Sequence, residues 1–322
     1  MRALVTGGAG FIGSHLVDLL LERGEDVSVL LGPGEQASES SKGRVRVFEG
    51  DVRDATVVGA AAEGADVIFH LAARTDLRGV ALEDYAVNTR GTEIVLAAAR
   101  QARSRRVIFF SSMLAVALTG RTDPIDERWS EEAASWYGRS KRLGEEMVRA
   151  SGVPFSILRP TLVYGPRERS TMHGFLKAVY RRRFILIGDD VFQTFAYVKN
   201  VARAAYDASR AEAAAGATFF VSDARPCTLA EFSNTAASAL GVRPWKLRLP
   251  VPLALAGGYV CDAIGALVGR ELPLSVRRVR TMTTHYVYSI EAARRAFGYS
   301  PPYTLEAALA ETAQWYLERG LL

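Results

Sequence analysis

A glycine-rich turn near the N-terminus constrains the fold more than any other feature of the chain. Residues 3–5 form an apolar run typical of a short buried strand, and apolar residues recur at helical spacing over residues 11–21. Three glycines at three-residue spacing lie at the junction: Gly7, Gly10 and Gly13. Such a junction presents free backbone N–H groups and the positive end of a helix dipole to a phosphate. The segment therefore predicts a nucleotide-phosphate site; the alternative is an ordinary strand-to-helix turn.

Each glycine has a separate role in a unit of this kind. Gly7 permits the tight turn, Gly10 lets the backbone approach a pyrophosphate, and Gly13 lets the helix pack on the strand. Phe11 and Ile12 lie between the last two glycines, at the start of the expected helix. We expect all five residues to bind a dinucleotide.

Short strands alternate with helical segments through the first half of the chain. After the first strand, further strands are expected at residues 27–31, 45–48, 67–71, 106–110 and 156–159. This alternation predicts an α/β fold with a doubly wound parallel Rossmann sheet, whose ligands bind at the carboxyl ends of the strands. We expect residues 1–165 to form a dinucleotide-binding domain, joined by strands near 194–202 and 217–222. Residues 166–322 are then mostly a smaller, interleaved substrate-binding region.

Tyr137 and Lys141 lie four residues apart on one face of an expected helix. Bringing a tyrosine pKa from about 10 to about 7 requires roughly 4 kcal/mol, which one ammonium about 4 Å away can supply. Ser112 follows the strand at 106–110, where it could stabilise charge on a substrate oxygen. A Tyr-x-x-x-Lys pair alone is usually a surface pair, but the glycine turn and Ser112 together favour a catalytic site.

These motifs resemble the extended short-chain dehydrogenase/reductase family, which includes nucleotide-sugar epimerases, dihydroflavonol reductases and 3β-hydroxysteroid dehydrogenases. The Gly-x-x-Gly-x-x-Gly turn after Val-Thr and the ordered Ser112, Tyr137 and Lys141 carry the resemblance. It implies that Tyr137 is the acid/base, that Lys141 lowers its pKa and holds the nicotinamide ribose, and that Ser112 orients the substrate oxygen. Ser111 is the alternative active hydroxyl, because the spacing to the following valine differs by one residue from that of many sugar epimerases.

The resemblance also implies a nicotinamide cofactor. The second strand ends in Leu-Leu-Gly-Pro, with neither an acid for a ribose 2′-hydroxyl nor an arginine for a 2′-phosphate. The choice between NAD and NADP is therefore open, with a slight preference for NAD. By the same resemblance Asp51 contacts the adenine ring and Asn88 steadies the active-site backbone; Asp51 could instead cap a helix or turn. The other cofactor contacts carried over are Val52, Leu71, Ala72, Ala73, Ser111, Pro160 and Val163.

Composition argues against several other classes of protein. The formal net charge of +5 is modest for 322 residues, and the arginine clusters lack interleaved aromatic residues, so no nucleic-acid partner is expected. The two cysteines and four histidines show no ligand spacing, so no metal is expected. The first residues already form a strand rather than a signal peptide, which favours a cytoplasmic protein.

Residues 249–268 are almost continuously apolar and approach the length of a membrane span. Two prolines, two adjacent glycines and Asp262 interrupt the run, which argues against a transmembrane helix. Leu253, Val260, Ile264 and Leu267 recur at helical spacing, so we expect a buried or substrate-covering helix. Peripheral membrane contact is the alternative.

The chain is thus expected to be an NAD(P)-dependent oxidoreductase that interconverts an alcohol and a ketone on a mainly apolar small molecule. In the resembled sugar enzymes an arginine commonly stands where this chain has Gln193, and glutamine cannot neutralise a phosphate. The alternatives are a nucleotide-sugar epimerase or dehydratase, and a non-catalytic dinucleotide-sensing protein. By resemblance, the helices near 85–102 and 137–150 would pair across a two-fold axis in a homodimer.

Overall fold

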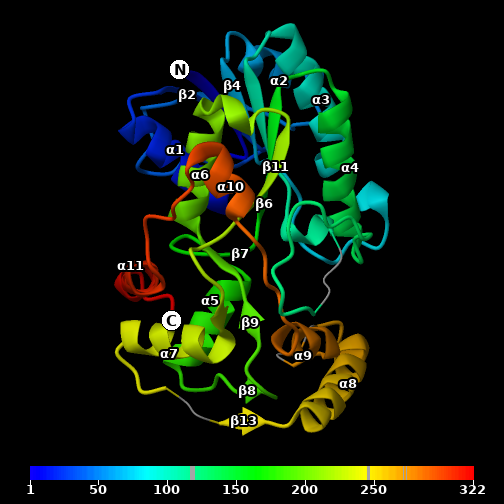
Figure 1. The fold of residues 1–322 in the computed structure, drawn as a ribbon, viewed down its shortest axis with the longest axis vertical. Helices are drawn as coiled ribbons and strands as arrows, with labels where there is room; N and C mark the ends of the chain where they lie inside the picture. Colours follow the sequence, from blue (N-terminus) through cyan, green and yellow to red (C-terminus); the bar gives the residue numbers. More distant parts are fainter. Residues whose placement is uncertain (117–119, 245–246, 271, 273) are drawn as a thin grey trace.

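The computed structural model describes residues 1–116, 120–244, 247–270, 272 and 274–322. A seven-stranded parallel sheet organises one end of the molecule, in the order β11-β6-β5-β4-β1-β2-β3 (Figure 1). Its strands are β1 (Arg2–Thr6), β2 (Asp26–Leu31), β3 (Arg46–Glu49), β4 (Val67–His70), β5 (Arg106–Phe110), β6 (Phe155–Pro160) and β11 (Ala217–Val221). The order reverses between β1 and β4, where a doubly wound sheet binds its ligand. The fold class expected from the sequence is confirmed.

Helices cover both faces of this sheet because its strands are apolar on both sides. One face packs against α1 (Phe11–Glu22), α6 (Val198–Arg210) and α10 (Glu291–Phe297). The other packs against α2 (Ala55–Ala62), α3 (Ala86–Gln101) and α4 (Trp136–Ala150). The two apolar cores therefore hold the sheet rigid, so that the segments leaving its carboxyl edge have fixed starting points.

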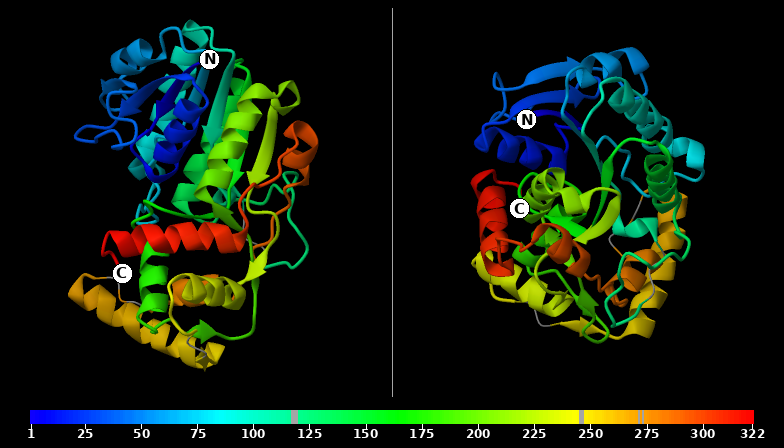
Figure 2. Two further views of the ribbon diagram at one scale, coloured as in Figure 1. Left: turned by 90° about the vertical axis from the view of Figure 1, so that its left-hand side faces the viewer. Right: turned by 45° about the horizontal axis from the view of Figure 1, so that its top comes forward.

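Most of the second half of the chain, apart from α6, α10 and β11, forms the other end of the molecule (Figure 2). Three two-stranded sheets lie in this part of the chain: β7 (Leu162–Tyr164) with β10 (Phe195–Tyr197), β9 (Phe192–Gln193) with β12 (Cys227–Thr228), and β8 (Leu186–Ile187) with β13 (Arg248–Leu249). The helices here are α5 (Thr171–Tyr180), α7 (Leu229–Ala239), α8 (Val251–Val268), α9 (Val276–Met282) and α11 (Leu305–Glu318). Short 3₁₀ turns occur at Leu82–Tyr85, Met113–Ala115 and Glu212–Ala214.

The strand expected near residues 194–202 is shorter than predicted and pairs outside the central sheet. It is only β10, which pairs with β7 outside the central sheet, and Val198 already begins α6. The apolar positions of α6 are buried beside α1 on the central sheet. The strand runs directly into the helix without a glycine or proline between them, which is why the boundary was misplaced. β11, by contrast, lies in the central sheet beside β6.

Within residues 249–268, Val251–Val268 form a helix as expected, but of the two expected roles the buried helix is wrong, and the substrate-covering helix stays a prediction. In α8 only Ala254 and Gly258 are buried, whereas Leu253, Val260, Ile264 and Leu267 are all exposed. The helix packs through Ala254, Gly258 and the partly buried Val251 and Leu255, and its other large apolar residues face outward. Helical spacing identified which residues of α8 share one face. It could not tell whether that face points toward the protein or toward solvent.

Candidate active site

The glycine turn connects β1 to α1 at the point where the strand order reverses. Gly7 has a φ of +71°, and a Cβ on it would come within 2.8 Å of the Ala72 nitrogen beyond β4. A Cβ on Gly13 would lie 2.1 Å from the Gly7 carbonyl oxygen. Both glycines are therefore required by close backbone contacts. Gly10 is different, because a Cβ there would meet only that same carbonyl oxygen, at 3.1 Å.

The N-terminus of α1 has the features of an anion site. Gly10 is its N-cap and makes no side-chain capping bond, and the first turn contains no acidic residue. The first N–H groups of a helix have no partner within the helix, so those of Phe11, Ile12 and Gly13 can donate to a phosphate. The open side of Gly10 leaves space for such a group. The residues present therefore fit the pyrophosphate of a dinucleotide.

Buried polar contacts fix the end of β4 against β1. Thr6 Oγ1 lies 2.8 Å from His70 Nδ1 and accepts from the backbone N–H groups of Leu71 and Ala72, at 3.2 and 3.1 Å. The other ring nitrogen of His70 lies 3.0 Å from Thr92 Oγ1 on α3. Burial lowers the pKa of His70 to about 3, so the ring is neutral at physiological pH. These contacts position Leu71, Ala72 and the following Ala73 at the carboxyl edge of the sheet.

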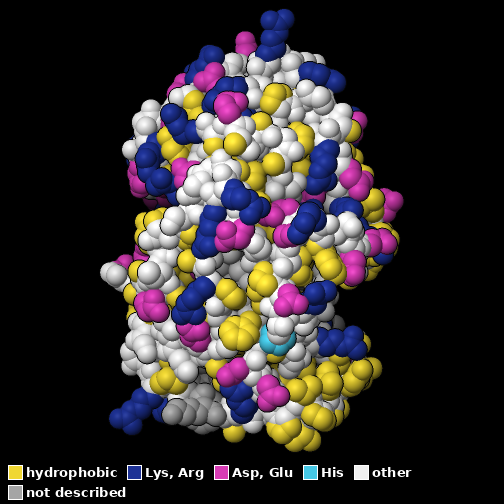
Figure 3. Space-filling view, in the orientation of Figure 1, with side chains coloured by type: hydrophobic (Ala, Val, Ile, Leu, Met, Phe, Trp, Pro, Cys, Tyr) yellow, Lys and Arg dark blue, Asp and Glu magenta, His cyan; other side chains and the backbone are white. Residues whose placement is uncertain are grey.

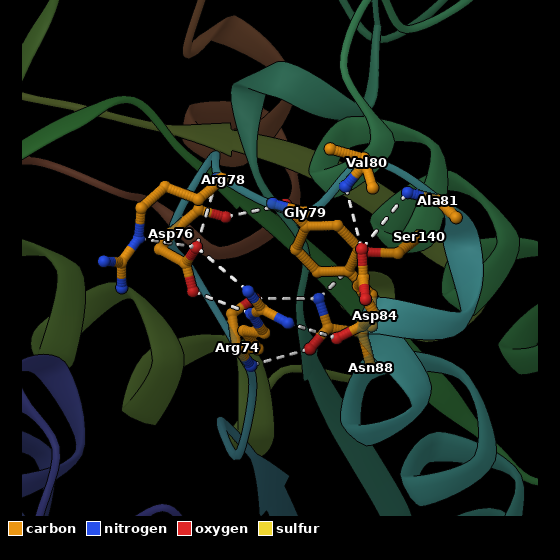
Figure 4. A network of polar contacts seen from close by, with 10 residues as sticks. Arg74, Asp76, Arg78, Gly79, Val80, Ala81, Asp84, Asn88 and Ser140 are labelled. Atoms are coloured by element: carbon orange, nitrogen blue, oxygen red, sulfur yellow. Dashed lines mark hydrogen bonds and ion pairs between the residues drawn. The ribbon is translucent and has the colours of Figure 1, made fainter. Parts of the chain in front are cut away.

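Asn88 joins the loop after β4 to helix α4 (Figure 4). Its Oδ1 accepts from Arg74 N at 2.8 Å, and its Nδ2 donates to the Arg74 carbonyl oxygen and to Ser140 Oγ, at 3.0 and 2.8 Å. Asp76 pairs with the Arg74 guanidinium, with 2.7 Å between Nε and Oδ2. Ser140 in turn donates to the Tyr137 carbonyl oxygen at 2.7 Å. Asn88 thus links the loop that follows β4 to the first turn of the helix that bears Tyr137.

Two small residues let α4 approach β5 closely. A Cβ on Gly138 would lie 2.1 Å from the Leu114 carbonyl oxygen, and one on Gly144 would lie 2.6 Å from the Phe109 ring. Ser135 caps the helix by accepting from the Gly138 N–H at 3.0 Å. This close packing brings Tyr137 against the residues that follow β5.

Ser112, Tyr137 and Lys141 lie together at the carboxyl end of β5. The Ser112 hydroxyl hydrogen-bonds to the Tyr137 side chain, and Ser112 Oγ accepts from Leu114 N at 3.1 Å. Lys141 is buried and its Nζ donates to the Phe110 carbonyl oxygen at 2.8 Å. A hydroxyl, a phenol and an ammonium therefore converge on one site, as the spacing in the sequence predicts.

Burial shifts the pKa values of Tyr137 and Lys141 so that the neutral form of each side chain is favoured. It raises the pKa of Tyr137 to about 12, against the lowering effect of the Ser112 hydrogen bond. It lowers the pKa of Lys141 to about 8, against the raising effect of Glu145. The predicted lowering of the Tyr137 pKa is therefore not found in the protein alone, because desolvation outweighs the Ser112 hydrogen bond. A phenolate here needs additional positive charge beside it.

Ser111 points away from this group, into a buried ion-pair network. Its Oγ donates to Glu145 Oε1 at 2.6 Å, and Arg159 donates to both oxygens of the same carboxylate, at 2.8 and 2.7 Å. Burial would raise the pKa of Glu145, but the hydrogen bonds and charge of Arg159 hold it below its usual value. The geometry favours Ser112 over Ser111 as the active hydroxyl. Lys141 and Glu145, four residues apart, look like a surface pair in the sequence, so no local pattern indicates this network.

The remaining residues expected to contact the cofactor differ in burial and in their partners. Asp51 accepts a hydrogen bond from Arg53, with 2.5 Å between Oδ2 and Nη2, and this contact lowers the pKa of the Asp51 carboxyl to about 2. The N-cap of α2 is Asp54 and not Asp51. Val52 is buried against Gly91 of α3, so its side chain belongs to the core. Pro160 ends β6 and is buried, while Val163 on β7 is partly exposed.

Among the residues that the structure describes, no cluster of three or more His, Cys, Asp or Glu side chains could hold a metal ion.

The chain is similar in sequence to several known proteins. Residues 4–251 match the model of the 3-beta hydroxysteroid dehydrogenase/isomerase family. A 3 beta-hydroxysteroid dehydrogenase/Delta 5-->4-isomerase of Mycobacterium tuberculosis is 30% identical, covering 98% of this chain and 90% of its own length. A 2-alkyl-3-oxoalkanoate reductase of Stenotrophomonas maltophilia is 29% identical (96% and 97% covered). An N-acetyl-alpha-D-glucosaminyl-diphospho-ditrans,octacis-undecaprenol 4-epimerase of Escherichia coli O157:H7 is 27% identical (98% and 95%).

The fold itself is shared with a solved UDP-glucose 4-epimerase from Thermotoga maritima. The TM-score is 0.80 at 22% identity, and 99% of each chain is covered. At this identity the likeness concerns the fold alone.

Proposed function

Because this chain belongs to the 3-beta hydroxysteroid dehydrogenase/isomerase family, we propose that it interconverts an alcohol and a ketone on a mainly apolar small molecule. The observation that carries the proposal is the convergence of Ser112, Tyr137 and Lys141 at the carboxyl end of β5. The family membership confirms the class expected from the sequence: an enzyme of the extended short-chain dehydrogenase/reductase family that uses NAD or NADP.

In this proposal Tyr137 moves the proton at the substrate oxygen. Its raised pKa keeps the phenol protonated, as proton donation to a carbonyl oxygen during reduction requires, but the phenolate that then forms needs positive charge beside it. In this proposal the substrate oxygen takes the place of Tyr137 as the partner of the Ser112 hydroxyl, while the Leu114 N–H still donates to Ser112 Oγ. Lys141 supplies positive charge when the tyrosinate forms in the oxidation direction. The nicotinamide, when bound, supplies or accepts the hydride and adds positive charge in its oxidised form.

The surroundings of the site support an apolar substrate. Gln193, which stands where the resembled sugar enzymes commonly have arginine, is buried and donates from Nε2 to the Thr281 carbonyl oxygen at 2.8 Å. It is thus engaged within the protein and carries no charge toward a diphosphate. A mostly apolar cluster begins at Met113, next to Ser112, and contains Met113, Val116, Ile125, Phe220, Tyr286 and Tyr288.

Nucleotide-sugar epimerisation is the second candidate. The 27% identity to a 4-epimerase over nearly the whole chain favours epimerase chemistry, but that relative is named for a sugar diphosphate on a long isoprenoid and not for a nucleotide sugar. Its chemistry would use the same proton transfer at Tyr137 without net oxidation. The two functions differ in whether free NAD(P)H accumulates.

The test is a panel of hydrophobic secondary alcohols and ketones beside nucleotide diphosphate sugars, with NAD and NADP each supplied. We expect a change in absorbance at the reduced-nicotinamide band with at least one apolar alcohol or ketone, and its loss in Tyr137→Phe. Micromolar binding of a nucleotide sugar, with conversion at C4 and no net cofactor reduction, would overturn the proposal in favour of an epimerase.

A further inference from the structure

Helix α8 is the most exposed apolar element among the described residues. The helix has 18 residues with a mean hydropathy of 1.7, which makes it long and apolar enough to cross a membrane. Only 11% of these residues are buried. Six large residues form what we term the apolar face: Leu253, Tyr259, Val260, Ile264, Leu267 and Val268, between 45% and 86% exposed. Figure 3 shows hydrophobic side chains gathered over this end of the molecule. Single exposed apolar residues need no explanation, but a contiguous patch marks an interaction surface.

The opposite side of α8 is held by the protein. A Cβ on Gly258 would lie 2.9 Å from the Val276 nitrogen, so α8 and α9 pack almost backbone to backbone. Asp262, the one charged residue of α8, accepts from the same Val276 N–H at 3.1 Å. Ala254 packs with Val279 and Ile187 in a small separate core. The helix is therefore fixed along one side, and its apolar face is presented by a rigid support rather than by a loose tail.

Positive charge adjoins the apolar face. Residues 269–282, which follow α8 and include α9, contain four arginines and one acidic residue. A hollow of about 470 Å³ lies where α8 meets the start of α9, and Arg270, Arg277 and Ser275 are among its lining residues. An apolar helix face bordered by arginines is the arrangement that binds the interface of an anionic bilayer.

We propose that α8 docks in the plane of a bilayer containing anionic phospholipids, with its apolar face among the acyl chains and the neighbouring arginines at the headgroups. An 18-residue helix is about 27 Å long, close to the lower limit for crossing the roughly 30 Å hydrocarbon core, and its attachment to α9 prevents lipid from surrounding it. Both facts favour a helix that lies on the membrane over one that spans it.

A second copy of the chain fits this surface less well. A two-fold contact through α8 would bring the arginine-rich segments of both copies to one interface, and like charges at close range oppose association. An anionic lipid surface complements that charge instead. This proposal does not depend on which reaction the protein catalyses, because it rests only on α8 and α9.

Co-sedimentation of the full chain with vesicles tests this. The probes are vesicles of phosphatidylcholine alone and of phosphatidylcholine with about one-third phosphatidylglycerol. We expect binding to the anionic vesicles that is at least about tenfold stronger than to the neutral ones and that weakens with salt. The double variant Leu253→Gln/Leu267→Gln should lose at least about tenfold of this binding. The matched control, Val47→Gln/Leu317→Gln, changes two exposed apolar residues elsewhere and should bind as the unchanged protein does.

Circular dichroism of both double variants establishes that they are folded, and the Tyr137-dependent turnover gives an independent check. Failure of the folded, unchanged protein to bind anionic vesicles would overturn the proposal. Equal binding by the two double variants would overturn it as well. A dimer in light scattering that the Leu253→Gln/Leu267→Gln variant converts to monomer, without vesicle binding by either protein, would instead assign the surface to a second copy of the chain.

Discussion

Helices α4 and α8 both hold side chains in surroundings that do not match their polarity, but in opposite senses. The sequence of α4 is rich in charge, yet Lys141 and Glu145 are buried within it. The sequence of α8 contains a single charge, yet most of the helix is exposed. Each mismatch is unfavourable for folding unless something compensates it.

The compensation differs between the two helices, and the difference is instructive. In α4 it comes from within the chain, because Arg159, Ser111 and the Phe110 carbonyl oxygen satisfy the buried charges. For α8 no compensation is found within the described part of the chain, and in our proposal it comes from a bilayer. A buried charge with satisfied partners thus points to chemistry inside the protein, whereas an uncovered apolar face points to a contact beyond it.

The strongest test of the α4 side is Tyr137→Phe. Removing one hydroxyl should lower turnover by about 100- to 10,000-fold, the range for an acid/base group. Affinity for NAD(P), measured by calorimetry, should change by less than about threefold, because the glycine turn supplies that affinity. Tyr180→Phe, on α5 and partly exposed, is the control and should keep full turnover. Near-native turnover of Tyr137→Phe would show that another residue transfers the proton.

Glu145→Gln tests whether the buried charges of α4 depend on their partners. The change keeps the shape of the side chain but leaves the buried Arg159 guanidinium without a counter-charge, so we expect a loss of about 3 kcal/mol in the free energy of unfolding. The control is the adjacent Glu146→Gln, whose exposed pair with Arg142 should contribute less than about 0.5 kcal/mol. Urea denaturation measures both. Equal effects would mean that the network does not stabilise the helix.

Gly10→Val tests the cofactor end of the same site. A branched side chain would fill the open side of the turn and prevent the N-terminus of α1 from donating to a pyrophosphate. Loss of two such charge-assisted hydrogen bonds should weaken NAD(P) binding by at least about 100-fold. In Gly59→Val, the added Cβ meets nothing within 4 Å in α2, and cofactor affinity should be unchanged. Undiminished affinity of a folded Gly10→Val variant would show that the turn does not hold the phosphates.

The difference between the helices also explains what the sequence could and could not predict. The glycine turn, the strand alternation and the Ser112–Tyr137–Lys141 set are local patterns, and each has one geometry that makes chemical sense. The role of Ser111 was ambiguous because it depends on Glu145 and Arg159, which are 34 and 48 residues away in the chain. The exposure of α8 was missed for a related reason. Periodicity reveals an apolar face but not whether the rest of the chain covers it.

The smallest expected effect provides the most direct test of the α8 side. Leu267 is 86% exposed, so Leu267→Gln should change the free energy of unfolding by no more than about 0.5 kcal/mol. Val148→Ala, at a fully buried position of α4, should cost about 2 kcal/mol through lost burial and the remaining cavity. Urea denaturation of the two variants in the absence of lipid makes the comparison. A loss above about 1 kcal/mol for Leu267→Gln would mean that the face is covered within the protein itself, and the contrast between the two helices would not hold. A negligible loss, with vesicle binding reduced in the same variant, would show that the apolar face of α8 stabilises a contact with the bilayer and not the fold.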